Sequence, residues 1–188
     1  MKVLVVGGGG REHAICECLS RSKRVKKIYA APGNAGIANL AECVDISVMD
    51  FEGLIDLVKK EGIDLSIIGM DDPLCAGIVD AFEAEGLRVF GPRKAAAILE
   101  GSKAFSKELM KKYSIPTAEY ECFDNYDKAA VYLESCKYPT VIKADGLALG
   151  KGVLICKNFE EAKTGIEELM IDKSFGDAGN TVVIEEFL

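Results

Sequence analysis

The chain has 188 residues, of which 49% are apolar and 28% are charged, and its formal net charge is −7. This apolar fraction excludes a disordered chain, and the length allows one domain or two small ones. No segment approaches the ~18 consecutive apolar residues of a membrane span, and no signal-peptide pattern follows Met1. The composition therefore predicts a globular, cytoplasmic protein.

The cysteines, the histidine and the charge balance narrow the kinds of site that the chain can carry. Seven cysteines occur without a CxxC pair, which is typical of reduced thiols packed as small core residues. A single histidine argues against a His-based zinc site, and an acidic chain is a poor general nucleic-acid binder. Residues 1–33 differ, because they hold seven Lys or Arg and only two Glu. This local positive charge favours a small anionic ligand.

Short apolar runs alternate with amphipathic segments over residues 1–90. The runs predict β-strands at Lys2–Val6, Lys27–Ala31, Val44–Ser47, Asp64–Gly69 and Arg88–Phe90. The segments between them predict helices at Arg11–Ser22, Phe51–Glu61 and Pro73–Glu85. Strands that are apolar on both sides and alternate with helices indicate an α/β fold, with an open parallel sheet covered on both faces.

A different pattern begins after the turn at Gly91-Pro92. A connector helix is expected over residues 102–113. Further strands are expected at Ala118–Phe123, Thr140–Ala144, Gly152–Lys157 and Thr181–Phe187, and helices at Asp124–Cys136 and Phe159–Met170. Residues 140–157 are expected to form an antiparallel hairpin. We therefore expect an α/β substrate-binding domain over 1–100, a connector helix over 101–117 and a small α+β lobe over 118–188.

The last predicted strand reaches Leu188 without a turn or a polar tail. Domain ends usually lie in exposed linkers. We therefore expect these residues to be the front part of a longer protein.

A glycine-rich turn from Gly7 to Gly10 joins the first predicted strand to the first helix. In a parallel α/β sheet this turn lies at the carboxyl ends of the strands, where ligands bind, and N–H groups at a helix start favour an anion. Arg11 supports an anion at Gly9 and Gly10, because a cation at a helix N-terminus is otherwise unfavourable. The turn is therefore a candidate phosphate site.

Two other predicted turns reach the same edge of the sheet. Asn34 follows the second strand, and its amide can contact a ligand. Asp72 follows the fourth strand, and its carboxylate can accept a hydrogen bond from a substrate hydroxyl or amine. The adjacent pair Asp71-Asp72 can equally cap the helix that follows.

A dinucleotide site is the main alternative for the glycine turn, and two observations argue against it. The GxGxxG fingerprint needs glycine where Glu12 or His13 stands, depending on whether it begins at Gly7 or Gly8. The second strand also ends in Ala31-Pro32 instead of the acidic residue that holds a ribose hydroxyl. A turn that serves strand–helix packing alone is the remaining alternative.

The clearest functional signal is VIKADGLALGKGV, residues 141–153, in the predicted hairpin. Lys143 is expected at the mouth of the hairpin. The loop after it contains three glycines and a lysine: Gly146, Gly150, Gly152 and Lys151. Such a loop can surround phosphates with N–H groups while a lysine neutralises charge. It is not a Walker loop, since GxxxxGK[ST] needs Ser or Thr where Gly152 stands. A hairpin tip with solvated lysines is the simpler alternative.

Two further segments become significant only in combination with this hairpin. Ser102 is predicted to cap the connector helix, and Lys103 follows it. If the connector packs beneath the hairpin, Lys103 and Lys143 flank one triphosphate. The end of the last strand offers backbone groups and carboxylates to the edge of a base: Glu185, Glu186, Phe187 and Leu188.

In this order and spacing, these segments resemble the glycinamide ribonucleotide synthetase (phosphoribosylamine–glycine ligase) family of the ATP-grasp superfamily. The resemblance is carried by GGGGREHA, APGNAG, PLCAGIVDAF, VFGP, EGSKAF, IPTAEY, VIKADGLALGKGV and VIEEFL, which together span the chain. Each segment alone is weak, and their joint order is specific. The resemblance implies a pre-ATP-grasp N-terminal domain followed by the first ATP-grasp lobe.

The resemblance also implies a reaction. Glycine, ATP and 5-phosphoribosylamine give glycinamide ribonucleotide, ADP and phosphate through a glycyl phosphate, in de novo purine biosynthesis. It implies Mg²⁺ (or Mn²⁺) as cofactor, small-molecule partners without nucleic acid or membrane, and a monomer or weak homodimer.

By analogy with the family, each candidate residue receives a role. Lys103 and Lys143 contact the ATP phosphates, the loop from Gly146 to Gly152 closes over them, and the last four residues meet the adenine. The ribose phosphate lies on a second group of residues, Gly9, Gly10, Arg11 and Asn34. Asp72 is placed at the sugar or amine end.

The chain departs from the family in two places. Where the family typically has Gly-Pro-Glu, a small residue and proline, this chain has Gly69-Met70-Asp71-Asp72-Pro73. The family also continues into a second lobe, which supplies the metal ligands and the glycine site. We therefore expect no metal ligand or catalytic residue within these 188 residues, and little or no activity from them alone. Another ATP-grasp ligase or carboxylase, and a non-catalytic nucleotide-binding fragment, are the alternatives.

Overall fold

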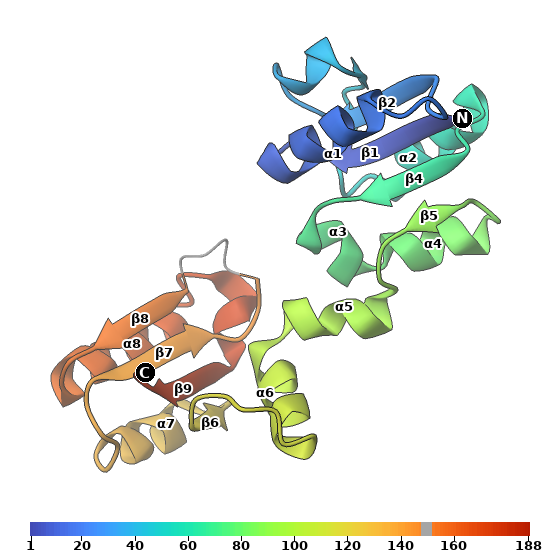
Figure 1. Cartoon of the computed structure of the whole chain (residues 1–188). Coiled ribbons are helices and arrows are strands. Elements are labelled where there is room, and N and C mark those ends of the chain that lie inside the picture. The colour runs from blue at the N-terminus through green and yellow to red at the C-terminus, as the bar shows by residue number, and fades with distance from the viewer. Residues whose placement is uncertain (148–151) are drawn as a thin grey trace. The chain divides into compact units, whose positions relative to one another are not determined.

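The computed structural model of the chain contains two sheets, one in each of two units that comprise Met1–Ala97 and Ile98–Leu188 (Figure 1). The structure describes residues 1–147 and 152–188, so the predicted site residues Gly150 and Lys151 lie outside the described residues. Among the described residues, no helix has both the length and the apolar character needed to cross a membrane.

The N-terminal unit is built on a five-stranded parallel sheet with the order β3-β2-β1-β4-β5. Its strands are β1 (Lys2–Gly7), β2 (Lys27–Pro32), β3 (Glu42–Cys43), β4 (Leu65–Ile68) and β5 (Val89–Phe90). Its helical segments are α1 (Gly10–Ser20), η1 (Ile37–Asn39), α2 (Phe51–Glu61), α3 (Asp71–Ala76) and α4 (Ile78–Ala84), and α5 (Lys94–Gly101) crosses the unit boundary. The predicted α/β architecture is confirmed.

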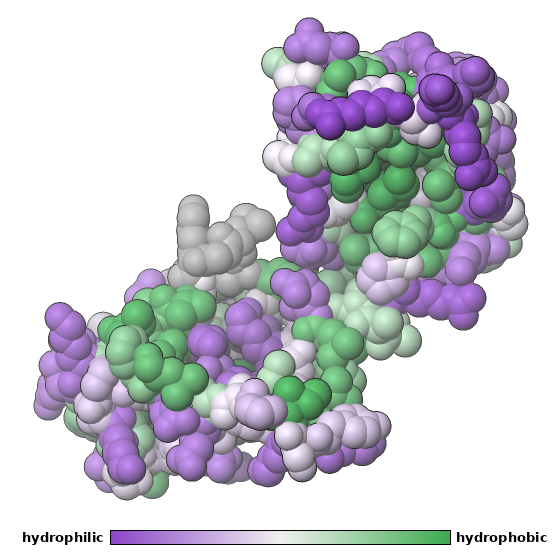
Figure 2. All heavy atoms as spheres, in the orientation of Figure 1, coloured by the Kyte–Doolittle hydropathy of each residue, from purple (hydrophilic) through white to green (hydrophobic). Residues whose placement is uncertain are grey.

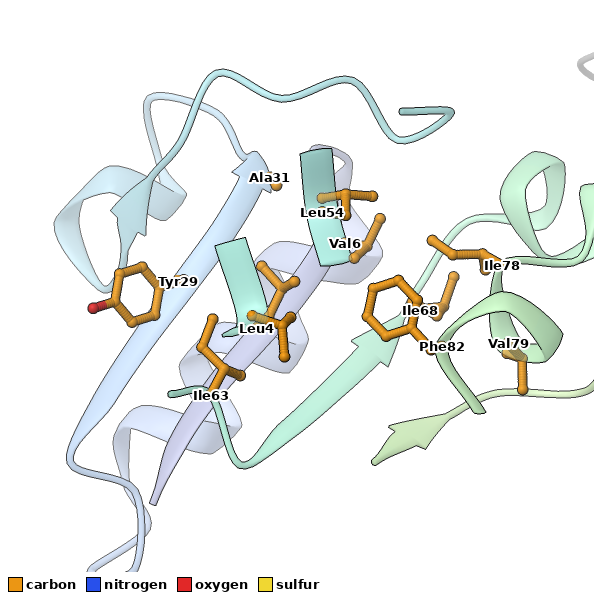
Figure 3. Packing of buried hydrophobic residues seen from close by; sticks show 11 residues of the cluster. Leu4, Val6, Tyr29, Ala31, Leu54, Ile63, Ile68, Ile78, Val79 and Phe82 are labelled. Atoms are coloured by element: carbon orange, nitrogen blue, oxygen red, sulfur yellow. The ribbon is translucent and has the colours of Figure 1, made fainter. Parts of the chain in front are cut away.

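Successive residues of β1 point to opposite faces of this sheet, and each face has its own core. Leu4 and Val6 belong to a cluster that includes Leu54 of α2 and Phe82 of α4 (Figure 3). Val5 belongs to the cluster on the other face, with residues of β2, α1 and η1. Burial on both faces explains why the strands are apolar throughout.

The predicted strand Val44–Ser47 is wrong, because the third strand is β3, two residues earlier. The Val44 N–H still donates to the Ala30 carbonyl at 2.8 Å, but the Ile46 N–H turns back to the Val44 carbonyl at 2.8 Å. This tight turn ends the ladder. Val44 and Ile46 pack against the core instead of extending the strand.

The predicted helix Pro73–Glu85 is wrong as a single element, because it is two helices that meet at Gly77. Gly77 has φ 105° and ψ 27°, a backbone conformation that ends α3 and redirects the chain into α4. Helix α5, which the sequence pattern did not indicate, follows the turn at Pro92. The connector helix is α6 (Lys103–Lys112), and the Ser102 hydroxyl accepts the Phe105 N–H at 3.0 Å as the predicted N-cap.

The C-terminal unit is built on a four-stranded antiparallel sheet with the order β6-β9-β7-β8. The strands are β6 (Tyr120–Phe123), β7 (Thr140–Ala144), β8 (Val153–Cys156) and β9 (Val182–Glu186). Helices α7 (Tyr126–Leu133) and α8 (Phe159–Met170) bury one face, and η2 (Gly176–Asn180) precedes β9. The predicted antiparallel hairpin is β7–β8.

The other face of this sheet carries the polar groups of the candidate nucleotide site. Lys143 of β7 and Glu185 of β9 lie there, while Ile142 and Ile184 point into the core. Hydrophobic surface also covers the edge strand β8, where Val153 and Ile155 are exposed (Figure 2). Of the cysteines, which the sequence predicted to be small core residues, Cys16 and Cys156 are buried, whereas Cys18 and Cys43 are exposed.

We expect Gly77→Ala to lower the free energy of unfolding by about 1–3 kcal/mol, because a side chain is strained at this φ. Urea unfolding measures the loss. Gly62→Ala is the matched control, since Gly62 has φ 62° with no atom near its added methyl, and its loss should be smaller, about 1 kcal/mol. Equal losses in the two variants would contradict the role given to Gly77.

Candidate functional site

Three turns meet at the carboxyl edge of the parallel sheet, as the sequence predicted. The Gly33 N–H donates to the Gly7 carbonyl at 3.2 Å, and the Asn34 side-chain N–H donates to the Gly8 carbonyl at 2.9 Å. The Asn34 Oδ1 atom accepts the Ile37 N–H at 2.9 Å. Both polar atoms of Asn34 are therefore used within the protein, where they hold the β2 turn against the glycine turn.

Arg11 links the glycine turn to the turn between β4 and α3. Its guanidinium donates to the Gly69 carbonyl at 2.6 Å and pairs with the Asp71 carboxylate at 3.2 Å. The Arg11 side chain remains 63% exposed, so this contact leaves part of the guanidinium accessible to a ligand. Asp71 is the first residue of α3 and Asp72 is the second. The hydrogen bonds and ion pairs of the described residues include the side chain of Asp71 but not that of Asp72.

Glu12 is the buried group beneath the glycine turn, and it is only 2% exposed. Its Oε2 atom accepts the Gly9 N–H at 2.7 Å. The side chain fills space that glycines leave open, since a Cβ at Gly7 would lie 2.6 Å from Glu12 Cγ and a Cβ at Gly69 would lie 2.2 Å from Glu12 Oε1. Glu12, Gly7 and Gly69 therefore fit only as a set.

The start of α1 retains groups that suit an anion. The first N–H groups of a helix have no acceptor within the helix. In α1 the first helical hydrogen bond is donated by the His13 N–H to the Gly9 carbonyl, at 3.1 Å. Because Glu12 takes the Gly9 N–H, the N–H groups of Gly10 and Arg11 are the better anion donors. Of the predicted phosphate residues, Gly10 and Arg11 thus have suitable geometry, while Gly9 and Asn34 shape the turn.

In the C-terminal unit, Asp145 joins the end of β7 to the start of α6. Its Oδ1 atom accepts the Ala104 N–H at 2.6 Å, and the Ser102 hydroxyl lies 3.1 Å from both carboxylate oxygens. The Lys103 N–H donates to the Asp145 carbonyl at 3.2 Å. These bonds hold the connector helix beside the hairpin. Lys103 was predicted to share a phosphate site with Lys143 only if the two elements pack together in this way.

Lys103 lies within this junction. Its ammonium donates to the Gly146 carbonyl at 2.9 Å and to the Asp145 carbonyl at 3.3 Å. Burial lowers the pKa of Lys103, the Asp145 carboxylate opposes that change, and the positive charge of Lys143 adds to it. The two predicted phosphate-binding lysines are therefore near enough to repel each other, as two groups that share one polyanion would be.

Lys143 is held by a buried carboxylate. Its ammonium donates to Glu185 Oε2 at 2.8 Å, and the same oxygen lies 3.3 Å from the ammonium of Lys107 in α6. The side chains of Glu185 and Lys107 are 7% and 10% exposed, and that of Lys143 is 27% exposed. Lys143 is thus the member of this triad that a ligand can reach.

The other predicted adenine-binding groups have local partners or are exposed. Glu186 Oε1 accepts the Glu119 N–H at 2.9 Å, so neither acidic side chain at this strand end is without a contact. Phe187 is 50% exposed and Leu188 is 87% exposed. Of the four predicted residues, Glu185 is therefore buried, whereas Glu186, Phe187 and Leu188 are exposed.

The glycines at the two ends of the hairpin loop pack closely. A Cβ at Gly146 would lie 2.9 Å from the Ala178 Cβ atom. Gly152 is buried, and its carbonyl accepts the Ala144 N–H at 2.8 Å. At position 146 the close contact favours glycine. At position 152 the backbone carbonyl pairs within the hairpin.

Sequence reasoning gave no role to three residues that organise these sites: Glu12, Lys107 and Asp145. Glu12 stands at the third helical position, where an acid commonly reaches back to the N–H before the helix. Lys107 stands one helical turn after Lys103, on the same side of α6. The positions of Glu12 and Lys107 within their helices could be seen in the sequence, whereas the groups that each residue contacts could not.

We expect Gly69→Ala to lower the free energy of unfolding by about 1–3 kcal/mol, because its methyl group would overlap buried Glu12. Replacing Glu12 as well should relieve the overlap, so Gly69→Ala should be less harmful in a Glu12→Ala background by about 0.5–3 kcal/mol. Urea unfolding of the four chains measures this coupling. Gly10→Ala is the control, since no atom lies within 4 Å of its added methyl. Additive losses would contradict the fit of Glu12 to Gly69.

Comparison with known proteins identifies both units. The N-domain model of phosphoribosylglycinamide synthetase matches residues 1–100, and the ATP-grasp (A) domain model of the same synthetase matches residues 101–188. A phosphoribosylamine–glycine ligase from Caldanaerobacter subterraneus subsp. tengcongensis is 55% identical over 188 residues, which are 100% of this chain and 45% of that protein. The chain thus spans about half the length of the curated relatives it matches.

Solved structures agree with the sequence comparison. The crystal structure of a phosphoribosylamine–glycine ligase from Thermotoga maritima is 34% identical with a TM-score of 0.81, and the match covers 100% of this chain and 44% of that one. The biotin carboxylase domain of 2-oxoglutarate carboxylase from Hydrogenobacter thermophilus has a TM-score of 0.80 at 21% identity, covering 100% of this chain and 44% of that chain, and it supports the fold alone. Since the two family models together match the chain from end to end, the chain belongs to the phosphoribosylglycinamide synthetase family.

Proposed function

We propose that this chain takes part in the ATP-dependent ligation of glycine to 5-phosphoribosylamine, giving glycinamide ribonucleotide, ADP and phosphate in de novo purine biosynthesis. The observation that carries the proposal is the convergence of Lys103 and Lys143 beside the β7–β8 hairpin, in a chain of this family. The relatives named phosphoribosylamine–glycine ligase support the substrates. We assign residues 1–100 to substrate binding, 101–117 to the connector and 118–188 to the ATP-grasp lobe.

The proposed reaction has two steps. The glycine carboxylate attacks the γ-phosphorus of ATP, forming glycyl phosphate and releasing ADP. The amine of phosphoribosylamine then attacks the carbonyl carbon, the amide bond forms, and phosphate leaves with the electron pair of the broken C–O bond while the amine loses a proton. The protein's contribution to such a transfer is mainly to position the reactants and neutralise charge. Lys103 and Lys143 supply positive charge to the polyphosphate.

We assign the remaining predicted residues to two ligands. Gly146, Gly150, Lys151 and Gly152 surround the ATP phosphates, and the strand end from Glu185 to Leu188 meets the adenine. At the sheet edge of the N-terminal unit, the N–H groups of Gly10 and Arg11 receive the ribose phosphate in a turn that Gly9 and Asn34 shape. Asp72 lies on the next turn and is assigned to the sugar or amine end.

Magnesium is proposed as the cofactor, but the described residues do not fit it. Residues 1–147 and 152–188 contain no group of three His, Cys, Asp or Glu placed to hold a metal ion. We therefore derive no step through the metal, and we propose that its ligands come from sequence beyond Leu188. Small molecules are the proposed partners, in a cytoplasmic protein that is a monomer or a weak homodimer.

ADP release tests the proposed function. The assay contains magnesium, ATP, glycine and freshly generated phosphoribosylamine, with each omitted in turn. We expect the 188-residue chain alone to be nearly silent. A chimaera that joins it to the remaining sequence of the Caldanaerobacter relative should release ADP only with both glycine and phosphoribosylamine. Release that depends on bicarbonate instead of glycine would assign the chain to a carboxylase.

Substitution within that chimaera tests the proposed phosphate contact. Lys143→Met should lower kcat/KM by about 10²-fold or more, because a charge aimed at the transferred phosphate is lost. Lys111→Met removes an exposed charge from α6 and should leave the rate within about twofold, as surface substitutions usually do. Equal rates for the two variants would contradict the role of Lys143.

A further inference from the structure

Lys107 is a buried lysine whose ammonium contacts three oxygens of the chain. Its ammonium donates to the Thr117 hydroxyl at 2.7 Å and to the Ala118 carbonyl at 3.3 Å, and it lies 3.3 Å from Glu185 Oε2. The ammonium also lies 5.3 Å from the centre of the Tyr120 ring. An ammonium has three N–H donors; two of them form these hydrogen bonds, and the Glu185 carboxylate forms an ion pair with the ammonium. Lys107 can therefore influence a ligand only through its neighbours.

The neighbour that transmits this influence is Glu185. Its Oε2 atom is shared between the ammonium groups of Lys107 and Lys143, at 3.3 Å and 2.8 Å. Among the described residues, Glu185 is the hydrogen-bonding partner of Lys143. Lys143 therefore retains donors for a ligand, and its side chain is the most exposed of the three.

The net charge of this triad depends on Lys107. Two ammonium groups and one carboxylate leave one positive charge, whereas Lys143 and Glu185 alone would be neutral. Because Lys107 and Glu185 are buried, water screens their charges less than it screens charges at the surface, so this difference reaches a polyanion at Lys143. We propose that Lys107 is a positioning residue that shares the Glu185 carboxylate and thereby leaves the charge of Lys143 available to the phosphates of the nucleotide. This inference rests on the proposed nucleotide site.

Stability alone is a weak explanation for a lysine at this position. Buried ion pairs often contribute little to stability, because removing charges from water offsets their attraction. With Met at position 107, Glu185 would still pair with Lys143 and exposed Thr117 could bond to water. The substitution therefore leaves no buried charge unpaired, and the folded chain can be used to test the role of Lys107.

Calorimetric titration of the 188-residue chain at low ionic strength tests the proposal, with inorganic tripolyphosphate, ADP and adenosine as probes. Lys107→Met should weaken binding of tripolyphosphate and ADP about tenfold, because one positive charge is lost. Adenosine, which has no phosphate, should bind within about twofold of its original affinity. A residue that only supports the fold would weaken all three probes together.

Two further variants make the test specific. Lys111→Met is the matched control, because Lys111 lies on the same helix and 6.0 Å from the same Tyr120 ring but does not contact Glu185 in the described structure. Its tripolyphosphate affinity should change less than about twofold, as expected for an exposed and screened charge. The double variant Lys107→Met/Glu185→Gln restores the single positive charge, so it should recover most of the lost tripolyphosphate affinity.

The outcomes separate this inference from the proposed function. The inference is overturned while the nucleotide site stands if Lys107→Met and Lys111→Met change the tripolyphosphate affinity equally. It is also overturned if Lys107→Met weakens adenosine binding as much as tripolyphosphate binding. If the unsubstituted chain binds neither tripolyphosphate nor ADP, the proposed site fails and the inference with it. Far-UV circular dichroism confirms that each variant is folded. Should Lys107→Met not fold, Lys107→Gln removes the same charge, keeps a donor for Thr117, and must meet the same expectations.

Discussion

The first N–H groups of α1 and α6, which have no acceptor within their own helix, are the constraint on which both candidate sites depend. No helical carbonyl can accept them, and in each case a carboxylate of the chain satisfies one: Glu12 accepts from Gly9, and Asp145 accepts from Ala104. In each case a cation, Arg11 or Lys103, stands directly at the helix start. At α1 the N–H groups of Gly10 and Arg11 remain as candidate donors to an anion. At α6 the first three N–H groups are all paired within the chain, so only the positive charge of Lys103 remains there.

The same carboxylates also hold the elements that carry these cations. Asp145 joins the end of β7 to α6, so Lys103 is held beside the hairpin that contains Lys143. Burial lowers the pKa of Lys103, and repulsion by the positive charge of Lys143 lowers it further, against the attraction of Asp145. That repulsion would be relieved if a polyanion bound at both lysines, as in the proposed nucleotide site. The chain's own contacts thus prepare a charge distribution that suits the proposed ligand.

Patterns with a local physical cause were predicted correctly from the sequence. Apolar strands separated by helices gave the parallel sheet, and the glycine-bearing hairpin and the Ser102 cap have their causes within a few residues. The errors occurred where a single backbone position decides the outcome. Gly77 divides a continuous helical pattern through its φ of 105°, and the turn at Ile46 ends β3 although Val44 and Ile46 continue the apolar alternation of a strand. Hydrophobic periodicity does not report either event.

The contacts between distant segments could not be predicted, because they depend on strand register. In the β7–β9 ladder Lys143 lies opposite Val183 and Val141 lies opposite Glu185, so Lys143 and Glu185 are diagonal neighbours on the same face. Long side chains can meet across such a diagonal. A shift of β9 by one residue would turn Glu185 toward the helices and place Ile184 beside Lys143. The pairing of Lys143 with Glu185 is therefore a consequence of register, which the burial of Ile142 and Ile184 on the opposite face maintains.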